Sequence, residues 1–379
     1  MGRAVHRATF VRFAASAALT APFLGAQRAL AAPPRQVVRP LVPVEVSLDR
    51  VTRTTVGLRP YRASGFVLRA EAHDAKTIIH DYGHGGGGMT LSWGTALLAT
   101  ELALQTQKRS AAVLGCGVIG LSTARALQDA GFAVTIYTRD VPPNTTSNLS
   151  GAQWTPASLF DSDKVDDAFR AQLVRASRLS FARYQTLLGE DYAVRWIKNY
   201  DCTDDPQSLL DTNATAKLIP DLYPESHTYG PGEHPFPTRY ATRFLTMFIE
   251  PNRYLRALQR DYLQRGGRIV VRAFDDLRQV LALDEPLVMN CTGLGAKTLV
   301  GDDQLEPVRG QLSFLAPQPA VDYITLHGGR YMFPRSDGIL LGGTFQYNNG
   351  NLDPDQATVT KIVGDHNAFF AAMRDRLGT

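Results

Sequence analysis

The sequence predicts an α/β protein of two domains. The chain has 379 residues, which is enough for two sizeable cores. A short apolar run, Ala111–Leu114, is followed at once by Gly115-x-Gly117-x-x-Gly120 and then by apolar residues at helical spacing. A second glycine-rich loop, Tyr82–Thr90, leads into another helix-like run. Strand, glycine loop and helix in succession are typical of nucleotide-binding α/β folds.

The first 32 residues have the layout of an export signal. Arginines precede an apolar, alanine-rich stretch, Phe13–Leu24, and Ala29–Ala31 resembles a small-residue cleavage site. The apolar stretch is too short for a stable membrane span. We expect an exported protein, periplasmic or extracellular; a disordered start or a transit peptide is the alternative. Export after a dinucleotide has bound would need a route for folded proteins, although the leader has no Arg-Arg pair.

Charge and cysteine usage argue against several classes of protein. The formal net charge of +4 includes the four arginines of residues 1–32, so the rest of the chain is close to neutral. This balance gives no support to a nucleic-acid partner. The cysteines have no CxxC spacing and no histidines at metal-ligand intervals, so we expect no metal site and interpret Cys116 and Cys291 as small buried residues. The sequence leaves the oligomeric state open.

The segment around the first motif predicts a strand–helix–strand unit of the Rossmann type. Gly115 allows a tight turn, Gly117 lets a pyrophosphate approach the backbone, and Gly120 lets the helix pack on the strand. A second predicted strand, Ala133–Tyr137, follows the helix. Strands on both sides favour a dinucleotide over a merely tight turn, which is the alternative.

Polar residues after the second predicted strand add candidate cofactor contacts. The acid that usually holds a ribose hydroxyl is not cleanly placed: Asp140 takes that role one position late, or Arg139 faces the phosphate side. Hydroxyls and small residues suit phosphate oxygens and a flat ring edge, although alone they indicate only a polar loop. These candidates are Thr145, Thr146, Ser147, Gly151, Ala152 and Gln153.

Several segments resemble the D-amino-acid oxidase family. They are Val113–Ala124, Thr145–Ser147, Gly151–Trp154, Val288–Gly293, Pro307–Gln311 and Leu341–Phe345. The resemblance implies FAD as the cofactor, and a Rossmann-like FAD-binding domain joined to a mixed-sheet α+β substrate domain. The further FAD contacts that it implies are Gly85, Gly86, Gly88, Met89, Thr90, Cys116, Val118, Ile119, Phe274 and Thr292.

Two segments that lie near the chain's end in this family come first here. In this chain the two segments are Gly57–Arg62 and Tyr82–Thr90, and the chain ends with a helix-like run, Ala368–Leu377. In the family, the equivalent of this last run is followed by the equivalents of the two segments. We interpret this order as a circular permutation closed by a polar link, Gln105–Ser110. A truncated fusion is the competing interpretation, but neither half of the chain duplicates the other.

The resemblance implies the oxidation of D-amino acids. Arg59 matches the family's carboxylate-binding arginine and Tyr331 its carboxylate-contacting tyrosine, while the Gly86 carbonyl would accept from the substrate amine. The Cα–H would then face the flavin and leave as hydride, without a protein base. O2 would reoxidise the flavin to give H2O2, and the imino acid would hydrolyse to 2-oxo acid and ammonia. For Tyr331, a core position in a strand is the alternative.

Neighbouring residues raise three further expectations. The helix N-terminus after Gly85–Thr90 would stabilise negative charge on a reduced flavin. His84 has no visible partner in the sequence, so we assign it no catalytic role. His327 and Arg330 would favour acidic side chains if they face the pocket, and otherwise they are solvated.

The boundaries expected from these assignments divide the chain into six parts. They are 1–32 (export signal), 33–110 (displaced segment), 111–158 (dinucleotide-binding unit), 159–254 (substrate domain), 255–312 (second part of the FAD domain) and 313–379 (substrate-domain strands, a return to the FAD domain and a closing helix). In more detail, we expect 43–76 in the substrate domain and 335–346 in the FAD domain.

Three hypotheses about function remain open. The first is an FAD oxidase of D-amino acids. The second is a flavin dehydrogenase or amine oxidase with another acceptor or substrate, such as glycine or a D-aspartate-like acid. The third is a non-catalytic FAD-binding protein, which the unusual segment order leaves open.

Overall fold

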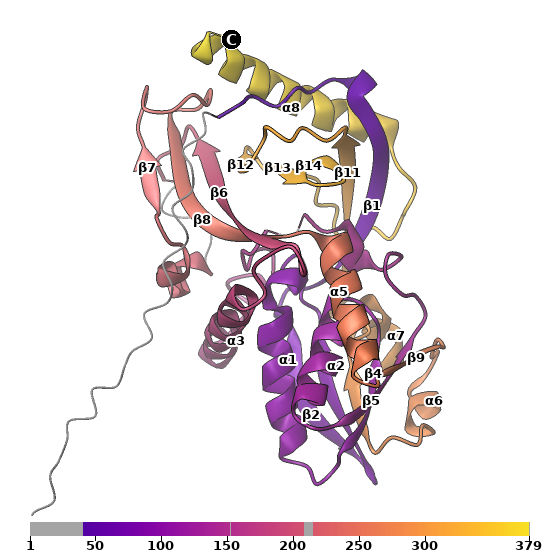
Figure 1. Ribbon diagram of the computed structural model, residues 1–379. Helices are drawn as coiled ribbons and strands as arrows, with labels where there is room; N and C mark the ends of the chain where they lie inside the picture. The colour runs from indigo at the N-terminus through magenta and orange to yellow at the C-terminus, as the bar shows by residue number, and fades with distance from the viewer. Residues whose placement is uncertain (1–40, 152, 208–214, 379) are drawn as a thin grey trace, which may run out of the picture. The chain divides into compact units, whose positions relative to one another are not determined.

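Two β-sheets organise the computed structural model, which describes residues 41–151, 153–207 and 215–378 (Figure 1). These residues belong to one unit that begins at Pro40. The expected export signal, residues 1–32, and the candidate contact Ala152 lie outside the described residues.

A six-stranded sheet carries the dinucleotide motif. Its strand order is β2-β3-β10-β4-β5-β9, and all neighbours are parallel except β2 and β3. The central strands are short apolar runs because both faces of a parallel sheet are covered. The strands are β2 (Val67–His73), β3 (Lys76–Tyr82), β10 (Leu287–Asn290), β4 (Ser110–Leu114), β5 (Ala133–Thr138) and β9 (Arg268–Val271).

Helices pack on both faces of this sheet. Ala111 and Val113 of β4 point into a large core with α1, α2, α3 and α5, whereas Ala112 and Leu114 point into a smaller core with α6 and α7. These helices are α1 (Gly88–Leu104), α2 (Val118–Asp129), α3 (Asp167–Gln185), α5 (Pro251–Gln264), α6 (Leu277–Leu281) and α7 (Ala296–Leu299). Among the residues that the structure describes, no helix combines the length and apolar character needed to cross a membrane.

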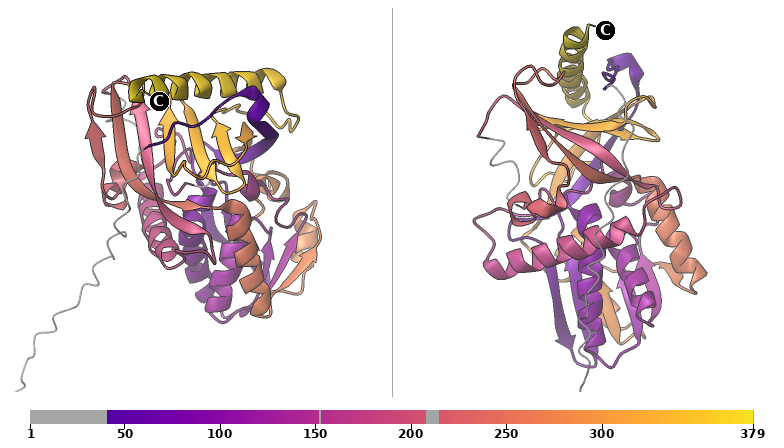
Figure 2. Two further views of the ribbon diagram at one scale, coloured as in Figure 1. Left: turned by 45° about the horizontal axis from the view of Figure 1, so that its top comes forward. Right: turned by 60° about the vertical axis from the view of Figure 1, so that its left-hand side comes forward.

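An eight-stranded sheet forms the second half, in the order β1-β11-β14-β13-β12-β6-β8-β7. Helix α8 (Gln356–Leu377) lies over one face of this sheet and shares a core with it (Figure 2). The strands are β1 (Val51–Arg62), β11 (Leu305–Leu315), β14 (Gly338–Gly342), β13 (Arg330–Arg335), β12 (Tyr323–His327), β6 (Val194–Thr203), β8 (Tyr240–Ile249) and β7 (His227–Tyr229). Short 3-10 turns are η1 (Leu48–Arg50), η2 (Thr146–Leu149), η3 (Ala216–Leu218), η4 (Pro220–Leu222) and η5 (Gly293–Gly295).

The face of the eight-stranded sheet opposite α8, called the inner face below, packs against the nucleotide-binding half. Phe248 of β8 forms an isolated β-bridge with Gln153. The Phe333 ring of β13 fills the space that a Cβ on Gly151 would need. Both phenylalanines belong to one apolar cluster with Leu312 and Leu340. The inner face is therefore the surface on which a substrate-binding residue can meet the cofactor-binding loops.

Three stretches lie in the other sheet from the one that the sequence predicts. Strand β2 belongs to the six-stranded sheet, although 43–76 is expected in the substrate domain, because β2 forms a tight hairpin with β3. Strands β11 and β14 belong to the eight-stranded sheet, although residues up to 312 and 335–346 are expected in the FAD domain. Apolar strand patterns do not specify which distant strand becomes the partner.

Candidate active site

The glycines of the dinucleotide motif occupy positions that exclude a side chain. Gly115, directly after β4, has φ +105°, and a Cβ there would lie 2.6 Å from the Cys291 carbonyl oxygen. A Cβ on Gly120 would clash with the Gly115 carbonyl oxygen, so this glycine lets α2 pack on the turn. A Cβ on Gly117, the N-cap of α2, would meet only Ser147 Oγ within 4 Å, at 3.2 Å.

The N-terminus of α2 and the polar turn η2 lie together. The Val118 N–H donates to Ser147 Oγ at 3.0 Å, and Thr145 Oγ1 donates to Asn148 Oδ1 at 2.8 Å within the same turn that contains Thr146. The first backbone N–H groups and the dipole of a helix attract phosphate. The lack of a side chain at Gly117 and the positive end of the α2 dipole fit the pyrophosphate of a dinucleotide, with the hydroxyls of η2 beside it.

Thr292 and Ile119 flank the same turn. The Thr292 Oγ1 donates to Asn290 Oδ1 at 2.7 Å, and its Cα lies 3.7 Å from the position of a Cβ on Gly115. Ile119 is partly buried in the first turn of α2. Both predicted contacts therefore lie where a dinucleotide would cross the ends of β4 and β10.

The other residues predicted to contact the cofactor near the Gly115 turn differ in their burial and in their partners. Cys116 is buried, and burial raises the pKa of its thiol to about 12, as expected for a packing residue. Arg139 Nε donates to Asp140 Oδ2 at 2.7 Å, and the Arg139 side chain is 81% exposed. This contact joins the two residues to each other and not to the Gly115 turn. Phe274 lies edge-on to Tyr137 with ring centroids 5.9 Å apart.

The oligoglycine loop between β3 and α1 is fixed from two sides. Gly85 N–H donates to the Pro60 carbonyl at 2.8 Å, and Gly86 N–H donates to the Ser158 carbonyl at 2.9 Å. Gly86 itself is exposed, unlike the buried Gly87. The loop therefore presents Gly86 to the surroundings while its backbone is held, which suits a flavin-contacting segment.

A buried pair beneath this loop was not visible in the sequence. His84 Nε2 lies 3.3 Å from Asp81 Oδ1, and both side chains are almost completely buried. The Phe66 ring stacks on His84 with centroids 5.1 Å apart. His84 thus has a partner, but its burial makes it a support of the loop, in keeping with the absence of an assigned catalytic role.

The first turn of α1 contacts the segment around Gln153. Gly88 opens the helix and Met89 is buried. Thr90 Oγ1 donates to the carbonyls of Thr155 at 3.0 Å and Gln153 at 3.3 Å, while Gln153 Nε2 donates to Asn199 Oδ1 at 3.2 Å. The predicted contacts Thr90 and Gln153 therefore lie side by side at the N-terminus of α1.

Arg59 and Tyr331 meet on the inner face. Arg59 Nη2 donates to Tyr331 Oη at 3.1 Å, and Nη1 donates to the Thr344 carbonyl at 3.2 Å. The guanidinium crosses β11 over Gly310, where a Cβ would lie 2.5 Å from Nη1, and a Cβ on Gly342 would clash with the Tyr331 ring. Two glycines in neighbouring strands thus make room for this contact.

Strand β1 brings Arg59 to both glycine loops. Pro60 accepts from Gly85 and lies 4.0 Å from the position of a Cβ on Gly293, next to the Gly115 turn. A Cβ on Gly57 would lie 3.5 Å from the Leu149 side chain in η2. The three predicted parts of the site therefore converge. Strand β1 runs without interruption from Val51 to Arg62, so Arg59 lies within a strand.

His327 and Arg330 lie on the face of the sheet that α8 covers. His327 stacks on Phe369 with centroids 3.8 Å apart, and Arg330 Nε donates to Asp365 Oδ2 at 2.7 Å. Both partners belong to α8. Of the two alternatives left open for these residues, neither holds: they face away from Tyr331, because successive residues of a strand point to opposite faces, and they pack against α8 instead of being solvated.

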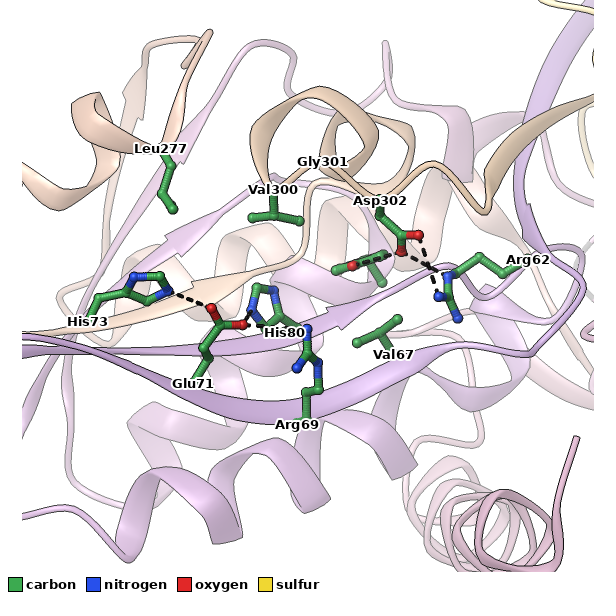
Figure 3. A pocket seen from close by; sticks show the side chains of 11 residues that line it. Arg62, Val67, Arg69, Glu71, His73, His80, Leu277, Val300, Gly301 and Asp302 are labelled. Carbon is green, nitrogen blue, oxygen red and sulfur yellow. Dashed lines mark hydrogen bonds and ion pairs between the residues drawn. The ribbon is translucent and has the colours of Figure 1, made fainter.

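A pocket of about 390 Å³ lies away from these residues, between β2, β3 and the segments around Leu277 and Asp302 (Figure 3). Inside this pocket, a carboxylate oxygen of Glu71 lies 2.9 Å from His73 Nε2 and the other lies 3.3 Å from His80 Nε2. None of the predicted site residues that the structure describes lines the pocket. Its polar groups are already paired with one another, so the convergence around Arg59 is the better candidate.

The fold and its glycine-rich turn are those of a protein that binds a dinucleotide at the ends of β4 and β10. The family model described as FAD dependent oxidoreductase matches residues 8–102 and 110–378, and the chain belongs to this family. FAD is therefore its cofactor.

Comparisons with individual proteins agree with this family. A D-amino-acid oxidase from Rubrobacter xylanophilus is 29% identical over 275 residues, which cover 70% of this chain and 78% of that protein. A D-amino acid oxidase from Dugesia ryukyuensis is 29% identical over 263 residues, or 66% and 75% of the two chains. The glycine oxidase structure from Geobacillus kaustophilus has a TM-score of 0.55 at 15% identity and covers 70% of this chain and 79% of its own. This likeness confirms the expected fold.

Proposed function

We propose that this protein is an FAD-dependent D-amino-acid oxidase. The observation that best supports the proposal is the hydrogen bond from Arg59 to Tyr331. Arg59 directly precedes Pro60, whose carbonyl accepts the hydrogen bond from Gly85 of the oligoglycine loop. No carboxylate partner of Arg59 is recorded in the described ranges, so its charge is free to bind a substrate carboxylate. The relatives named D-amino-acid oxidases support the same substrate class.

The residues present fit FAD at both ends of the site. The N-terminus of α2, with Ser147, would hold the pyrophosphate. Gly86, Thr90 and the N-terminus of α1 would contact the flavin ring and stabilise negative charge on it. FAD held there would supply the two-electron redox chemistry, and the balanced overall reaction would convert amino acid, O2 and water into 2-oxo acid, ammonia and H2O2.

The chain itself binds and orients the substrate in this proposal. Arg59 and Tyr331 Oη hold the α-carboxylate, and the carbonyl of exposed Gly86 accepts a hydrogen bond from the amine. With both groups fixed, only one hand of Cα directs its hydrogen toward the cofactor. Handedness therefore follows from binding, and no protein base is required.

Flavin spectroscopy tests this function. The purified protein should carry a flavin absorption spectrum that D-alanine bleaches without oxygen, whereas L-alanine leaves it unchanged. In air, D-alanine should produce equal amounts of H2O2 and 2-oxo acid. Bleaching without oxygen consumption would instead indicate a dehydrogenase with another acceptor, and a flavin that no amino acid reduces would contradict the proposal.

We further propose that the chain is a circular permutation of the family's usual order. The C-terminal part of α8 lies beside the start of the described chain, because Arg374 Nη1 donates to the Val44 carbonyl at 3.2 Å. The family match is also split, and its gap, 103–109, falls on the link between α1 and β4. A rearranged gene that encodes 110–378 before 41–104 should yield a protein that binds FAD and oxidises the same substrates; an unfolded product would contradict the permutation.

Export remains a proposal based on the leader's composition. We propose that residues 1–32 direct the protein out of the cytoplasm and are removed. Cell fractionation and N-terminal sequencing test it, with a mature chain that starts near Ala32 as the expected result. A full-length protein found with the cytoplasmic fraction would contradict it.

A further inference from the structure

A row of half-buried side chains crosses the inner face beside Arg59. Tyr331 of β13 lies opposite Leu326 of β12, which lies opposite Asp201 of β6. Residues opposite one another in a sheet point to the same face, and Tyr200 and Cys202 belong to the α8 core, so Asp201 points to the inner face. Two strand spacings place the backbones of Asp201 and Tyr331 about 10 Å apart.

Asp201 is a carboxylate without a partner. Neither a hydrogen bond nor an ion pair of its side chain is recorded among the residues that the structure covers. Burial raises the pKa of its carboxyl to about 6, so the group is still ionised at neutral pH. A partly desolvated charge without a partner is unfavourable in itself, and such groups are typical of ligand-binding positions.

Charge is distributed unevenly over the inner face. Arg53 pairs with Asp337 at 2.7 Å, and Arg195 lies 3.9 Å from Glu250. Arg59 and Asp201, in contrast, have no ionic partner within the described ranges. A ligand that satisfies both needs an anionic group at one end and a cationic group at the other.

We infer that the substrates are D-amino acids with a long cationic side chain, of the D-lysine or D-arginine type, an inference that rests on the proposed function. The α-carboxylate binds Arg59 and Tyr331 Oη, and the terminal cation pairs with Asp201. The three or four methylene groups between them lie over Leu326, which is half-buried and apolar. An acidic side chain would meet a like charge at the far end of this row.

The ratio of kcat/KM for D-lysine to that for D-norleucine tests the inference. D-norleucine has a similar stem without the ammonium group, so the ratio isolates the charge at Asp201. We expect about a ten- to hundredfold preference for D-lysine, which Asp201→Asn largely removes. Equal kcat/KM for the two substrates, or a preference that survives in the variant, would overturn the inference. If no D-amino acid reduces the flavin, the proposed function itself fails, which is a different outcome.

Two controls keep this test decisive. Asp303→Asn removes the same charge from an exposed position outside the row, and should retain the preference for D-lysine. If Asp201→Asn fails to fold, the wild-type protein can be inhibited with ε-aminocaproate and with caproate, which lack the reacting Cα amine. The amine-bearing acid should bind about tenfold more tightly; equal inhibition would overturn the inference.

Discussion

On the face of the eight-stranded sheet that α8 covers, charged and polar side chains pair with one another, whereas on the inner face two charged side chains have no ionic partner among the described residues. Under α8, Arg330 bonds to Asp365, and His327 lies 3.2 Å from His366. On the inner face, Arg59 has only neutral acceptors, and Asp201 has no recorded partner among the described residues. Both faces are built from the same strands, so the difference lies in what each face is used for.

This comparison separates charges that support the fold from charges that are available to a ligand. Charges with partners under α8 are buried with their hydrogen bonds made, as is usual in protein cores. A charge left without a partner destabilises the free protein and is explained by a bound molecule that supplies the partner. Removal of a charge that has no ionic partner on the inner face should therefore alter activity, whereas removal of a paired or buried side chain on either face should mainly alter stability.

Arg59→Leu should show the largest effect on the inner face. The substitution removes a charge-assisted, two-point contact with the substrate carboxylate, so kcat/KM should fall about 10³-fold. Thermal stability should fall only modestly, because Arg59 makes two hydrogen bonds to neutral acceptors and its guanidinium carbon lies 4.4 Å from the centroid of the Phe345 ring. Steady-state kinetics and a melting curve of the holoenzyme measure the two quantities.

Arg53→Leu is the matched control on the same strand. Arg53 lies over the Phe314 ring and pairs with Asp337, so its loss should lower stability modestly and leave kcat/KM within about threefold. Equal losses of kcat/KM in both variants would show that any arginine of β1 is needed for the fold, and would remove the special role of Arg59.

Phe370→Ala should show the opposite pattern under α8. Phe370 is completely buried between α8 and the sheet, so the cavity left behind should lower the free energy of unfolding by about 3–4 kcal/mol. The folded fraction should retain its kcat/KM, because the inner face is unchanged. Leu377→Ala, at a 41% exposed position of the same helix, should cost much less. Urea titration with activity assays tests both, and a large loss of kcat/KM in folded Phe370→Ala would contradict the separation of the two faces.

The dinucleotide turn could be predicted from sequence alone because its physics is local. Gly115 and Gly120 meet within one turn of chain, and the strand and helix around them are contiguous in sequence. The burial of Cys116 and Cys291 was likewise predicted and is confirmed. Elements of this kind need no knowledge of distant partners.

The substrate side of the site depends on pairings that the sequence does not encode locally. Arg59 and Tyr331 are 272 residues apart, and only the family resemblance suggested both. Asp201 was not identified from the sequence, because its position beside Leu326 depends on the parallel register of β6 and β12, two strands that are distant in sequence. A slip of that register by one residue would place Asp201 under α8, so the chemistry of this face follows from tertiary structure.

The two histidines under α8 should make stability depend on pH. Burial lowers the pKa of His366 to about 3 and that of His327 to about 4, while both have values near 6.5 in the unfolded chain. The unfolded state therefore binds more protons below pH 6.5, and the free energy of unfolding should fall as the pH drops through that value. His366→Asn should reduce this loss between about pH 7 and pH 5 by up to about 2 kcal/mol.

Urea midpoints at several pH values measure this effect. The comparison uses the slope with pH, so any fixed loss of stability from removing the hydrogen bond between His366 and the Gly342 carbonyl does not matter. An unchanged slope in His366→Asn would show that this histidine does not titrate on unfolding, and would leave the acid sensitivity to other groups.

Asp201→Asn, unlike the other substitutions, should raise the stability of the free protein at neutral pH. Because the folded-state pKa of Asp201 is raised from 3.8 to about 6, the ionised carboxyl disfavours the folded state above pH 6. The variant should therefore be more stable than the wild type by about 1–2 kcal/mol near pH 7.5, and this gain should vanish below the unfolded value of 3.8. A variant that is less stable at neutral pH would mean that the Asp201 carboxylate supports the fold, as Asp365 does under α8, and the contrast between the two faces would lose its anionic half.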